Sequence, residues 1–181
     1  MLKSERLQFI PLNESHAEGL YELWGNPLVV KYIMCPLKNS VPDCKDWINK
    51  MLTDLEEPNV FTIFFNQRII GIGGTPYWHK EEGDYGLYYQ LAEKYWGAGF
   101  GMEIATTLSE YAFIQRKAEK ISTYAVTENT GSNRILQKLG MHITDRRDGG
   151  FIKGGFTYDE NHYTMTKIEW YSLFAKDHNI L

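Results

Sequence analysis

The chain contains the run Trp96-Gly97-Ala98-Gly99-Phe100-Gly101-Met102-Glu103, in which three glycines alternate with other residues where a helix-compatible segment begins. Glycine reaches positive φ at little cost and lets a ligand approach the backbone closely. A helix start adds unpaired N–H groups and the positive end of the helix dipole. The run therefore predicts an anion cradle, most naturally for phosphate.

Two common phosphate loops fit this run poorly. A dinucleotide-binding loop places its glycines directly after the first strand of the domain. Here the preceding strand is expected to end near Leu91, and residues 92–96 intervene. A nucleoside-triphosphate loop requires Gly-Lys-Ser/Thr, which does not occur in the sequence. A plain tight turn stays open as an interpretation until the rest of the chain is considered.

Composition sets the outer limits. With 181 residues, 43% hydrophobic and 23% charged, the chain is expected to form one domain over residues 1–181. A net charge of −4 gives no indication of broad nucleic-acid binding. We find neither an apolar signal core at the N-terminus nor an apolar run long enough for a membrane-spanning helix.

Cysteine usage indicates the compartment. Cys35 and Cys44 are too few for a disulfide framework or a zinc site, so we expect reduced thiols in a cytoplasmic protein without a metal. Cys35 precedes Pro36 in an expected loop, but no histidine-paired motif supports it as a catalytic thiol.

Strands and helices alternate along the chain without a linker. Strands are expected at 7–10, 61–65, 69–73, 85–91, 121–126, 141–144 and 162–168, the last of which closes the sheet. Helices are expected after Asn13 or Ser15, at 28–33, from Val41 with the apolar stripe Trp47, Ile48, Met51 and Leu55, at 99–114 and at 131–139. The glycine pairs at 149–150 and 154–155 frame a hairpin or loop. Antiparallel hairpins followed by a βαβα unit predict a mixed sheet with helices on its faces.

A second motif follows the strand at 121–126. It reads Asn129-Thr130-Gly131-Ser132-Asn133-Arg134-Ile135-Leu136-Gln137-Lys138-Leu139-Gly140-Met141. Its apolar residues can pack on one side of a helix that ends at Gly140. Asn129 and Ser132 can cap this helix, contact a ligand, or do both.

Together the two motifs resemble those of the GNAT superfamily of N-acetyltransferases, especially the branch that includes the ribosomal-protein alanine N-acetyltransferases. In that branch the phosphate loop is similar to the stretch from Tyr95 to Glu103, and the second motif is similar to the stretch from Asn129 to Met141. The opening, Glu5-Arg6-Leu7 through Pro11-Leu12, and Glu169-Trp170 near the end also look similar. The resemblance covers nearly the whole chain.

The resemblance implies an α/β fold: a mixed, mostly antiparallel twisted sheet, helices on both faces, and a splayed strand pair that opens a slot for acetyl-CoA. Pyrophosphate would lie on the N–H groups of the glycine run, pantetheine beside the strand before it, and the thioester near Asn129 and Ser132. The implied cofactor-binding residues are Tyr89, Gln90, Leu91, Trp96, Gly97, Ala98, Gly99, Phe100, Gly101, Met102, Asn129, Ser132 and Arg134.

The implied reaction transfers acetyl directly to a primary amine, on a small molecule or a protein N-terminus, through a ternary complex. Many relatives carry a glutamate where this chain has Gly86. Asp84 lies two residues earlier on the same strand face and is our first candidate base, with Glu82 and His79 as alternatives. The superfamily's frequent tyrosine acid is replaced by Leu136, so Ser132 is the candidate proton donor, with Asn129 beside it.

The acceptor pocket is expected between the early helices, the loop around Trp78 and the segment 151–158. Tyr32, Trp78 and Tyr85 are the candidate lining residues, whereas Trp24 and Trp47 are expected to pack in the core. Two other classes stay open: a non-catalytic acyl-CoA-binding or sensing domain, and a nucleotide-binding module. The protein is expected to be a monomer or a homodimer.

Overall fold

The strands form two five-stranded sheets. The computed structural model describes residues 2–54 and 59–178, so Leu55 of the predicted apolar stripe lies outside the described residues. The strands are β1 (Leu2–Lys3), β2 (Gln8–Pro11), β3 (Val60–Phe65), β4 (Arg68–Gly74), β5 (Tyr77–His79), β6 (Asp84–Gly86), β7 (Tyr88–Leu91), β8 (Lys120–Val126), β9 (His142–Lys153) and β10 (Phe156–Thr166). One sheet has the order β1-β2-β3-β4-β7 and the other β5-β6-β8-β10-β9.

A single segment passes from one sheet to the other. β6 pairs in parallel with β8, and the Leu87 amide still donates to the Ser122 carbonyl at 3.0 Å. From Tyr88 onward the chain pairs with β4 instead. The strand predicted at 85–91 is therefore two strands, one in each sheet, and β7 diverges from β8. This arrangement confirms the mixed, mostly antiparallel fold with a splayed strand pair.

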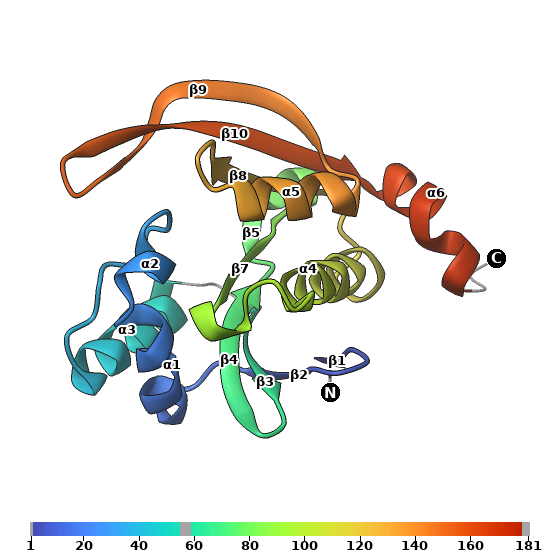
Figure 1. The fold of residues 1–181 in the computed structure, drawn as a ribbon. Coiled ribbons are helices and arrows are strands. Elements are labelled where there is room, and N and C mark those ends of the chain that lie inside the picture. The colour runs from blue at the N-terminus through green and yellow to red at the C-terminus, as the bar shows by residue number, and fades with distance from the viewer. Residues whose placement is uncertain (1, 55–58, 179–181) are drawn as a thin grey trace.

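Helices cover both faces, as predicted (Figure 1). They are α1 (Ala17–Trp24), α2 (Pro27–Val30), α3 (Val41–Asp54), α4 (Phe100–Glu110), α5 (Thr130–Leu139) and α6 (Lys167–His178). One apolar core packs α1–α3 against the β3–β4 face through side chains such as Ile48 and Ile72, and the other packs α4 against the opposite face through Ile104 and Leu108. A sheet with two apolar faces needs such cover on each side.

The tryptophan of α1 connects the apolar core formed by α1–α3 to β7. Trp24 is fully buried, as predicted, and its indole N–H donates to the Gln90 side-chain oxygen at 2.8 Å. Buried indole N–H groups normally find such a partner. Trp47 is only half-buried, so its expected place in the core is only partly realised.

The C-terminal strands differ from the prediction. β9 and β10 form one long hairpin whose turn is Gly154-Gly155, and the pair Gly149-Gly150 lies inside β9. Gly149 has φ +65°, and the β9–β10 register shifts opposite it, between Tyr158 and Glu160. The glycines thus make a strand irregularity rather than a turn. β10 lies inside the sheet, so β9 forms its edge, and residues 167–168, predicted as strand, begin α6. The hairpin extends over α2 (Figure 1).

Candidate active site

The edge of β7 that faces β8 carries free backbone groups. Alternate residues of a strand direct their N–H and C=O groups to opposite edges. The Ala92 amide donates to the Ile70 carbonyl at 2.8 Å, toward β4, whereas the Leu87 amide points to β8. Tyr89 and Leu91 therefore present their N–H groups to the space that β8 has left. The Leu91 carbonyl on this edge accepts the Trp96 indole N–H at 2.8 Å.

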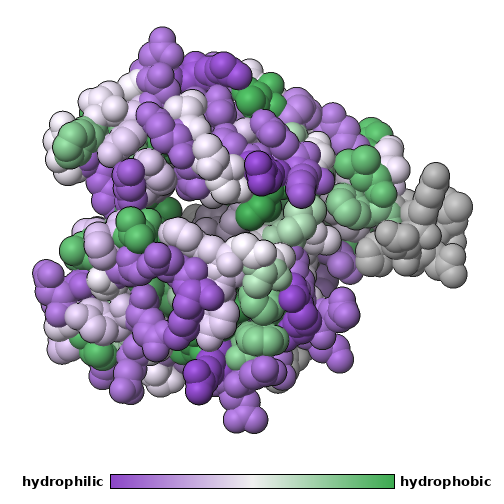
Figure 2. Space-filling view, in the orientation of Figure 1, coloured by the Kyte–Doolittle hydropathy of each residue, from purple (hydrophilic) through white to green (hydrophobic). Residues whose placement is uncertain are grey.

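A cavity of about 280 Å³ lies where β7 and β8 part. The slot runs between them and opens at the surface, where Figure 2 shows the molecule hollowed between the β9–β10 side and the α2–α3 side. Its lining residues come from four regions of the chain. They are Tyr32, Ile33, Met34, Cys35, Trp47, Met51, Pro76, Trp78, Gly86, Leu87, Tyr88, Tyr89, Gln90, Thr123, Tyr124, Ala125, Asn129, Ser132 and Leu136.

The N-terminus of α5 forms one wall of this cavity. Asn129 caps the helix, and its side-chain oxygen accepts the Ser132 amide at 3.2 Å. The Tyr89 hydroxyl is buried beside Ser132, and burial raises the pKa of Tyr89 well above its usual range, against the opposing effect of Ser132. Three polar side chains thus meet at the cavity wall: a capping amide, a serine hydroxyl and a neutral phenol.

Asn133 holds α5 in place. Its amide nitrogen donates to the carbonyls of Val126 and Asn129, both at 2.8 Å. Its oxygen accepts from Asn161 at 2.9 Å and from the Tyr163 hydroxyl at 2.7 Å. No role was predicted for Asn133 from the sequence. The available signal was its place on the inward side of the helix, three residues before Leu136.

The glycine run precedes α4 with the expected backbone. Gly97 has φ +75° and Gly99, the N-cap residue, has φ +83°. A Cβ added to Gly97 would meet nothing within 4 Å, whereas one on Gly101 would lie 2.7 Å from Ile135 of α5. The first two glycines therefore serve conformation, Gly97 also leaves open space before the helix start, and the third lets α4 and α5 pack closely.

An ion pair fixes the glycine run to the N-terminal segment. The Arg6 guanidinium contacts Glu103 of α4 at 2.7 Å, donates to the Ala98 carbonyl at 3.3 Å and lies 4.2 Å from the centre of the Phe100 ring. Ser4 donates to Glu103 at 2.6 Å. Burial opposes the charge on Glu103, yet hydrogen bonds from Ser4 and Arg6 hold the pKa of Glu103 below its usual value.

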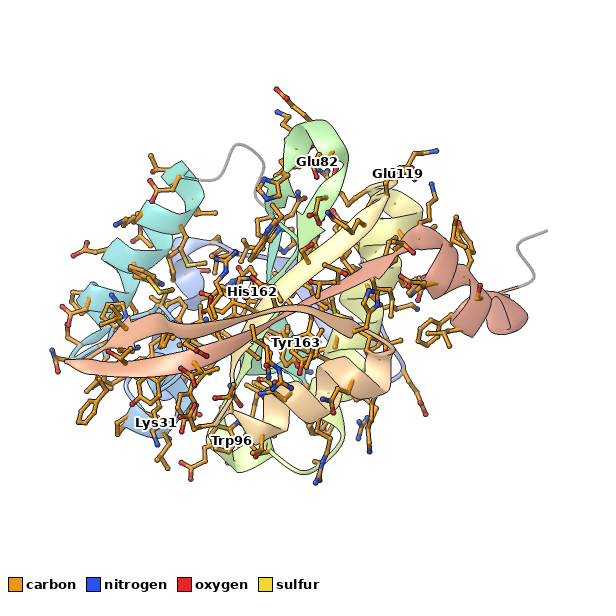
Figure 3. All side chains as sticks on the ribbon, turned by 90° about the horizontal axis from the view of Figure 1, so that it is seen from above. Lys31, Glu82, Trp96, Glu119, His162 and Tyr163 are labelled. Carbon is orange, nitrogen blue, oxygen red and sulfur yellow. The ribbon has the colours of Figure 1, made fainter. Side chains whose placement is uncertain are left out.

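The structure brings together only some of the predicted site residues. Tyr89, Gln90, Asn129, Ser132, Tyr32 and Trp78 line the cavity. Leu91, Arg134 and the run from Trp96 to Met102 lie outside its lining. Arg134 is exposed on α5. Figure 3 places Trp96 and Glu82 at opposite edges of the molecule, with His162 between them in that view.

Tyr85 was predicted to line the acceptor pocket, but it is not among the residues that line the cavity. It is buried in the α4 core, its ring is 4.7 Å from that of Tyr77, and its hydroxyl donates to the Arg116 carbonyl at 3.4 Å. Side chains alternate along a strand, so Tyr85 points to the opposite face from Asp84 and Gly86.

Asp84 is buried in a polar cluster, two residues before Gly86, which lines the cavity. It contacts Lys120 at 3.0 Å and accepts from Ser122 at 2.9 Å, but it is not a lining residue. Its second oxygen is buried and has no hydrogen-bond partner among the described residues. Glu82 is largely exposed and lies 3.7 Å from Lys120. His79, the other alternative, is exposed on β5.

Gly86 and Cys35 limit the chemistry of the cavity. A Cβ on Gly86 would lie 3.3 Å from Pro76, so a side chain at this position would be in tight contact with the proline. Burial raises the pKa of the Cys35 thiol to about 12. At neutral pH the thiol is protonated, and only the thiolate is strongly nucleophilic.

Comparison with known proteins supplies the family. The profile of the Acetyltransferase (GNAT) domain matches residues 6–142. The chain belongs to this family. Like its GNAT relatives it is an acyl-CoA-dependent N-acetyltransferase. It is 29% identical over 145 residues to an uncharacterized N-acetyltransferase, p20, of Bacillus licheniformis, covering 77% of this chain and 81% of that one.

Two solved GNAT structures share the fold. A ribosomal L7/L12 alpha-N-protein acetyltransferase, RimL, in complex with coenzyme A superposes with a TM-score of 0.78 at 16% identity, over 90% of this chain and 95% of that one. Spermidine N-acetyltransferase of Vibrio cholerae, in complex with CoA and spermine, gives 0.80 at 17% identity, over 91% and 98%. At such identities the likeness concerns the fold.

In residues 2–54 and 59–178, no helix is long and apolar enough to span a membrane. The same ranges contain no cluster of three or more histidine, cysteine or acidic side chains suited to hold a metal ion.

Proposed function

We propose that the protein transfers acetyl from acetyl-CoA directly to a primary amine in the cavity between β7 and β8. The observation that carries this proposal is the open edge of β7 facing a cavity that ends at the N-terminus of α5. An extended amide-containing arm can pair with such an edge as an added strand would. Acetyl-CoA, when bound, supplies the activated acyl group as a thioester.

The glycine run would hold the pyrophosphate. Open space at Gly97 and the left-handed Gly99 expose the first N–H groups of α4, and the helix dipole favours an anion there. Along β7, Leu91 would donate a backbone hydrogen bond to the pantetheine arm, and Trp24 holds the Gln90 side chain from behind. Trp96 and Arg134 would lie at the outer end of this path.

Ser132 and Asn129 would act at the thioester end. Ser132 can return a proton to the departing sulfur, and the Tyr89 N–H can stabilise charge on the carbonyl oxygen. An alkyl amine is mostly protonated at pH 7, so a base is needed. Asp84 is our candidate, acting through water, because one of its oxygens has no hydrogen-bond partner among the described residues and because Gly86, on the same strand face, lines the cavity.

Two measurements made together test the proposal. Calorimetric titration with acetyl-CoA, CoA and ATP should show micromolar binding of both CoA ligands and none of ATP. Thiol release should follow when a suitable amine is added. Acetyl-CoA binding without thiol release on any amine would favour a non-catalytic acyl-CoA-binding domain instead. Competition by ATP would favour a nucleotide-binding module.

A further inference from the structure

The acceptor side of the cavity is almost entirely apolar. Beyond the α5 end, its walls come from the segment 32–35, from α3 and from the β5 region, and their side chains are aromatic, aliphatic or sulfur-containing. They are Tyr32, Ile33, Met34, Cys35, Trp47, Met51, Pro76, Trp78 and Tyr124. Among the described residues that line the cavity, none is charged.

This lining discriminates between amines. A polyamine or an aminoglycoside keeps further ammonium groups after one nitrogen has entered the slot. Each of these would face described lining residues that carry no carboxylate, and an unpaired charge is costly to remove from water. An acceptor with a single amine has no such charge left over. Aromatic faces also attract its one ammonium group before the proton is lost.

The aromatic part of the wall is held in a fixed arrangement. The Tyr124 ring lies 6.2 Å from Trp78 on one side and is stacked 5.9 Å from His162 on the other. Glu160 fixes His162 at 2.6 Å. A Cβ on Gly150 would come within 2.6 Å of the Glu160 side chain, so glycine makes room for this pair. The wall therefore has a defined shape before any acceptor arrives.

Lys153, at the tip of the β9–β10 hairpin, holds the opposite wall. Its ammonium donates to the carbonyls of Val30, Ile33 and Cys35, at 2.5, 2.6 and 2.7 Å. The Tyr32 and Tyr158 rings also meet edge to face at 5.6 Å. These contacts tie the segment that supplies four lining residues to the hairpin.

The hairpin and the stretch 28–37, which includes the lining segment 32–35, carry exposed apolar side chains. These are Leu28, Met34, Leu37, Ile152 and Phe156, each at least 45% exposed. Since Met34 also lines the cavity, apolar surface continues from the cavity to the outside. Figure 2 shows hydrophobic atoms beside the hollow between the two sides. An apolar acceptor would remain in contact with such surface over its whole length.

We infer that the acceptor is a monoamine carried by an apolar, preferably aromatic, body, such as an arylalkylamine. This inference rests on the proposed transferase function. The amine nitrogen forms the amide bond as the C–S bond of the thioester breaks, one proton leaves the nitrogen, and the CoA sulfur leaves as thiolate and takes up a proton.

An acceptor panel tests the inference. Phenethylamine, tryptamine and hexylamine should be acetylated with kcat/KM at least about tenfold above spermidine, kanamycin and an alanine-initiated peptide, the range that apolar pockets typically discriminate. Trp78→Ala should raise KM for phenethylamine about tenfold and leave the acetyl-CoA Kd unchanged. Ile168→Ala, on the exposed side of α6, is the matched control and should change neither. A preference for spermidine, kanamycin or the peptide would overturn the inference.

A gained charge gives a second test. Met34→Glu places a carboxylate on the wall at a position 67% exposed, where it can be solvated. It should shift the ratio of kcat/KM for spermidine over phenethylamine upward by about tenfold; an unchanged ratio would contradict the inference. Calorimetry of phenethylamine with the CoA-loaded protein separates the two proposals. Binding without acetylation would support the pocket and overturn the transferase. Acetylation of spermidine alone would support the transferase and overturn the acceptor class.

Discussion

Gly97 and Gly154 adopt the same kind of backbone conformation in two different parts of the molecule. Both have left-handed φ, +75° and +60°, and a Cβ on either would meet nothing within 4 Å. Alanine at such a position costs about 1–2 kcal/mol of backbone strain. If the glycine run binds pyrophosphate, Gly97→Ala should weaken acetyl-CoA binding about three- to tenfold by calorimetry. Gly154→Ala, in the hairpin turn, should lose similar unfolding free energy and bind acetyl-CoA normally. Equal effects on Kd would contradict the assignment.

Asp84 is the residue on which the proposed proton transfer depends. Asp84→Asn keeps a side chain that can accept from Ser122, but it removes the base. We expect kcat to fall about 10²–10⁴-fold, the usual contribution of general base catalysis, with the acetyl-CoA Kd unchanged. Steady-state thiol release measures this. Glu82→Gln is the control, because Glu82 also approaches Lys120 but is largely exposed. A loss of less than twofold in Asp84→Asn would move the search for the base elsewhere.

At the scale of elements, agreement with the sequence follows local signals. α5 was predicted to within one residue because its cap, apolar spacing and terminal Gly140 all agree. The hairpin was misjudged because Gly149-Gly150 has the same local appearance as the real turn at Gly154-Gly155. Only the packing of Glu160 over Gly150, ten residues away, distinguishes them. The change of sheet at Leu87 likewise depends on contacts with β4 and β8 rather than on local sequence.

Asn133 should be the residue that most firmly joins α5 to its sheet. Asn133→Ala would leave the Asn161 amide and the Tyr163 hydroxyl without this acceptor in a buried site. An unsatisfied buried group costs about 1–3 kcal/mol. We therefore expect a loss of about 2–3 kcal/mol in unfolding free energy, measured by urea denaturation. Lys138→Ala, exposed on the same helix, should cost less than about 0.5 kcal/mol. Similar losses in both variants would show that the Asn133 network contributes little.

The contact that Lys153 of the hairpin makes with the carbonyls of Val30, Ile33 and Cys35 can be tested independently of the cofactor site. Burial lowers the pKa of Lys153, which nonetheless donates to three carbonyls of the acceptor wall. Lys153→Met keeps the stem and removes the donors. We expect KM for the acceptor to rise at least about fivefold, while the acetyl-CoA Kd stays the same, since ordering of this wall is lost. Lys45→Met, which removes an exposed pair with Glu14, is the control. An unchanged KM would show that the wall is ordered without Lys153.

At the scale of the whole molecule, the site forms where the two sheets part. The glycine run and the start of α5 could be predicted because each lies within one contiguous motif. On the acceptor side, Tyr32 and Trp78 were predicted, but Trp47 and Tyr124 were not, because they reach the cavity from elements distant in sequence. Each of these last two aromatics has the local spacing of a core residue. Their position at a surface depends on the divergence of β7 from β8.

Ser4 and Arg6, near the start of the chain, contact Glu103 of α4. The stability of the protein in acid tests this contact between distant parts of the molecule. The pKa of Glu103 in the folded state lies below its ordinary value of 4.5, so its contribution is fully present above that value and is lost as the pH falls through the folded pKa. Glu103→Gln should cost about 1–2 kcal/mol at pH 7, the usual range for hydrogen bonds to a charged group, discounted because Arg6 is 40% exposed. The difference in unfolding free energy between the unmodified protein and Glu103→Gln, measured by urea denaturation, should decrease steadily as the pH falls below 4.5. Because Arg6 also holds Ala98 and Phe100, Glu103→Gln should weaken acetyl-CoA binding at pH 7 as well. A difference that stays constant with pH would mean that the charge of Glu103 does not stabilise this contact.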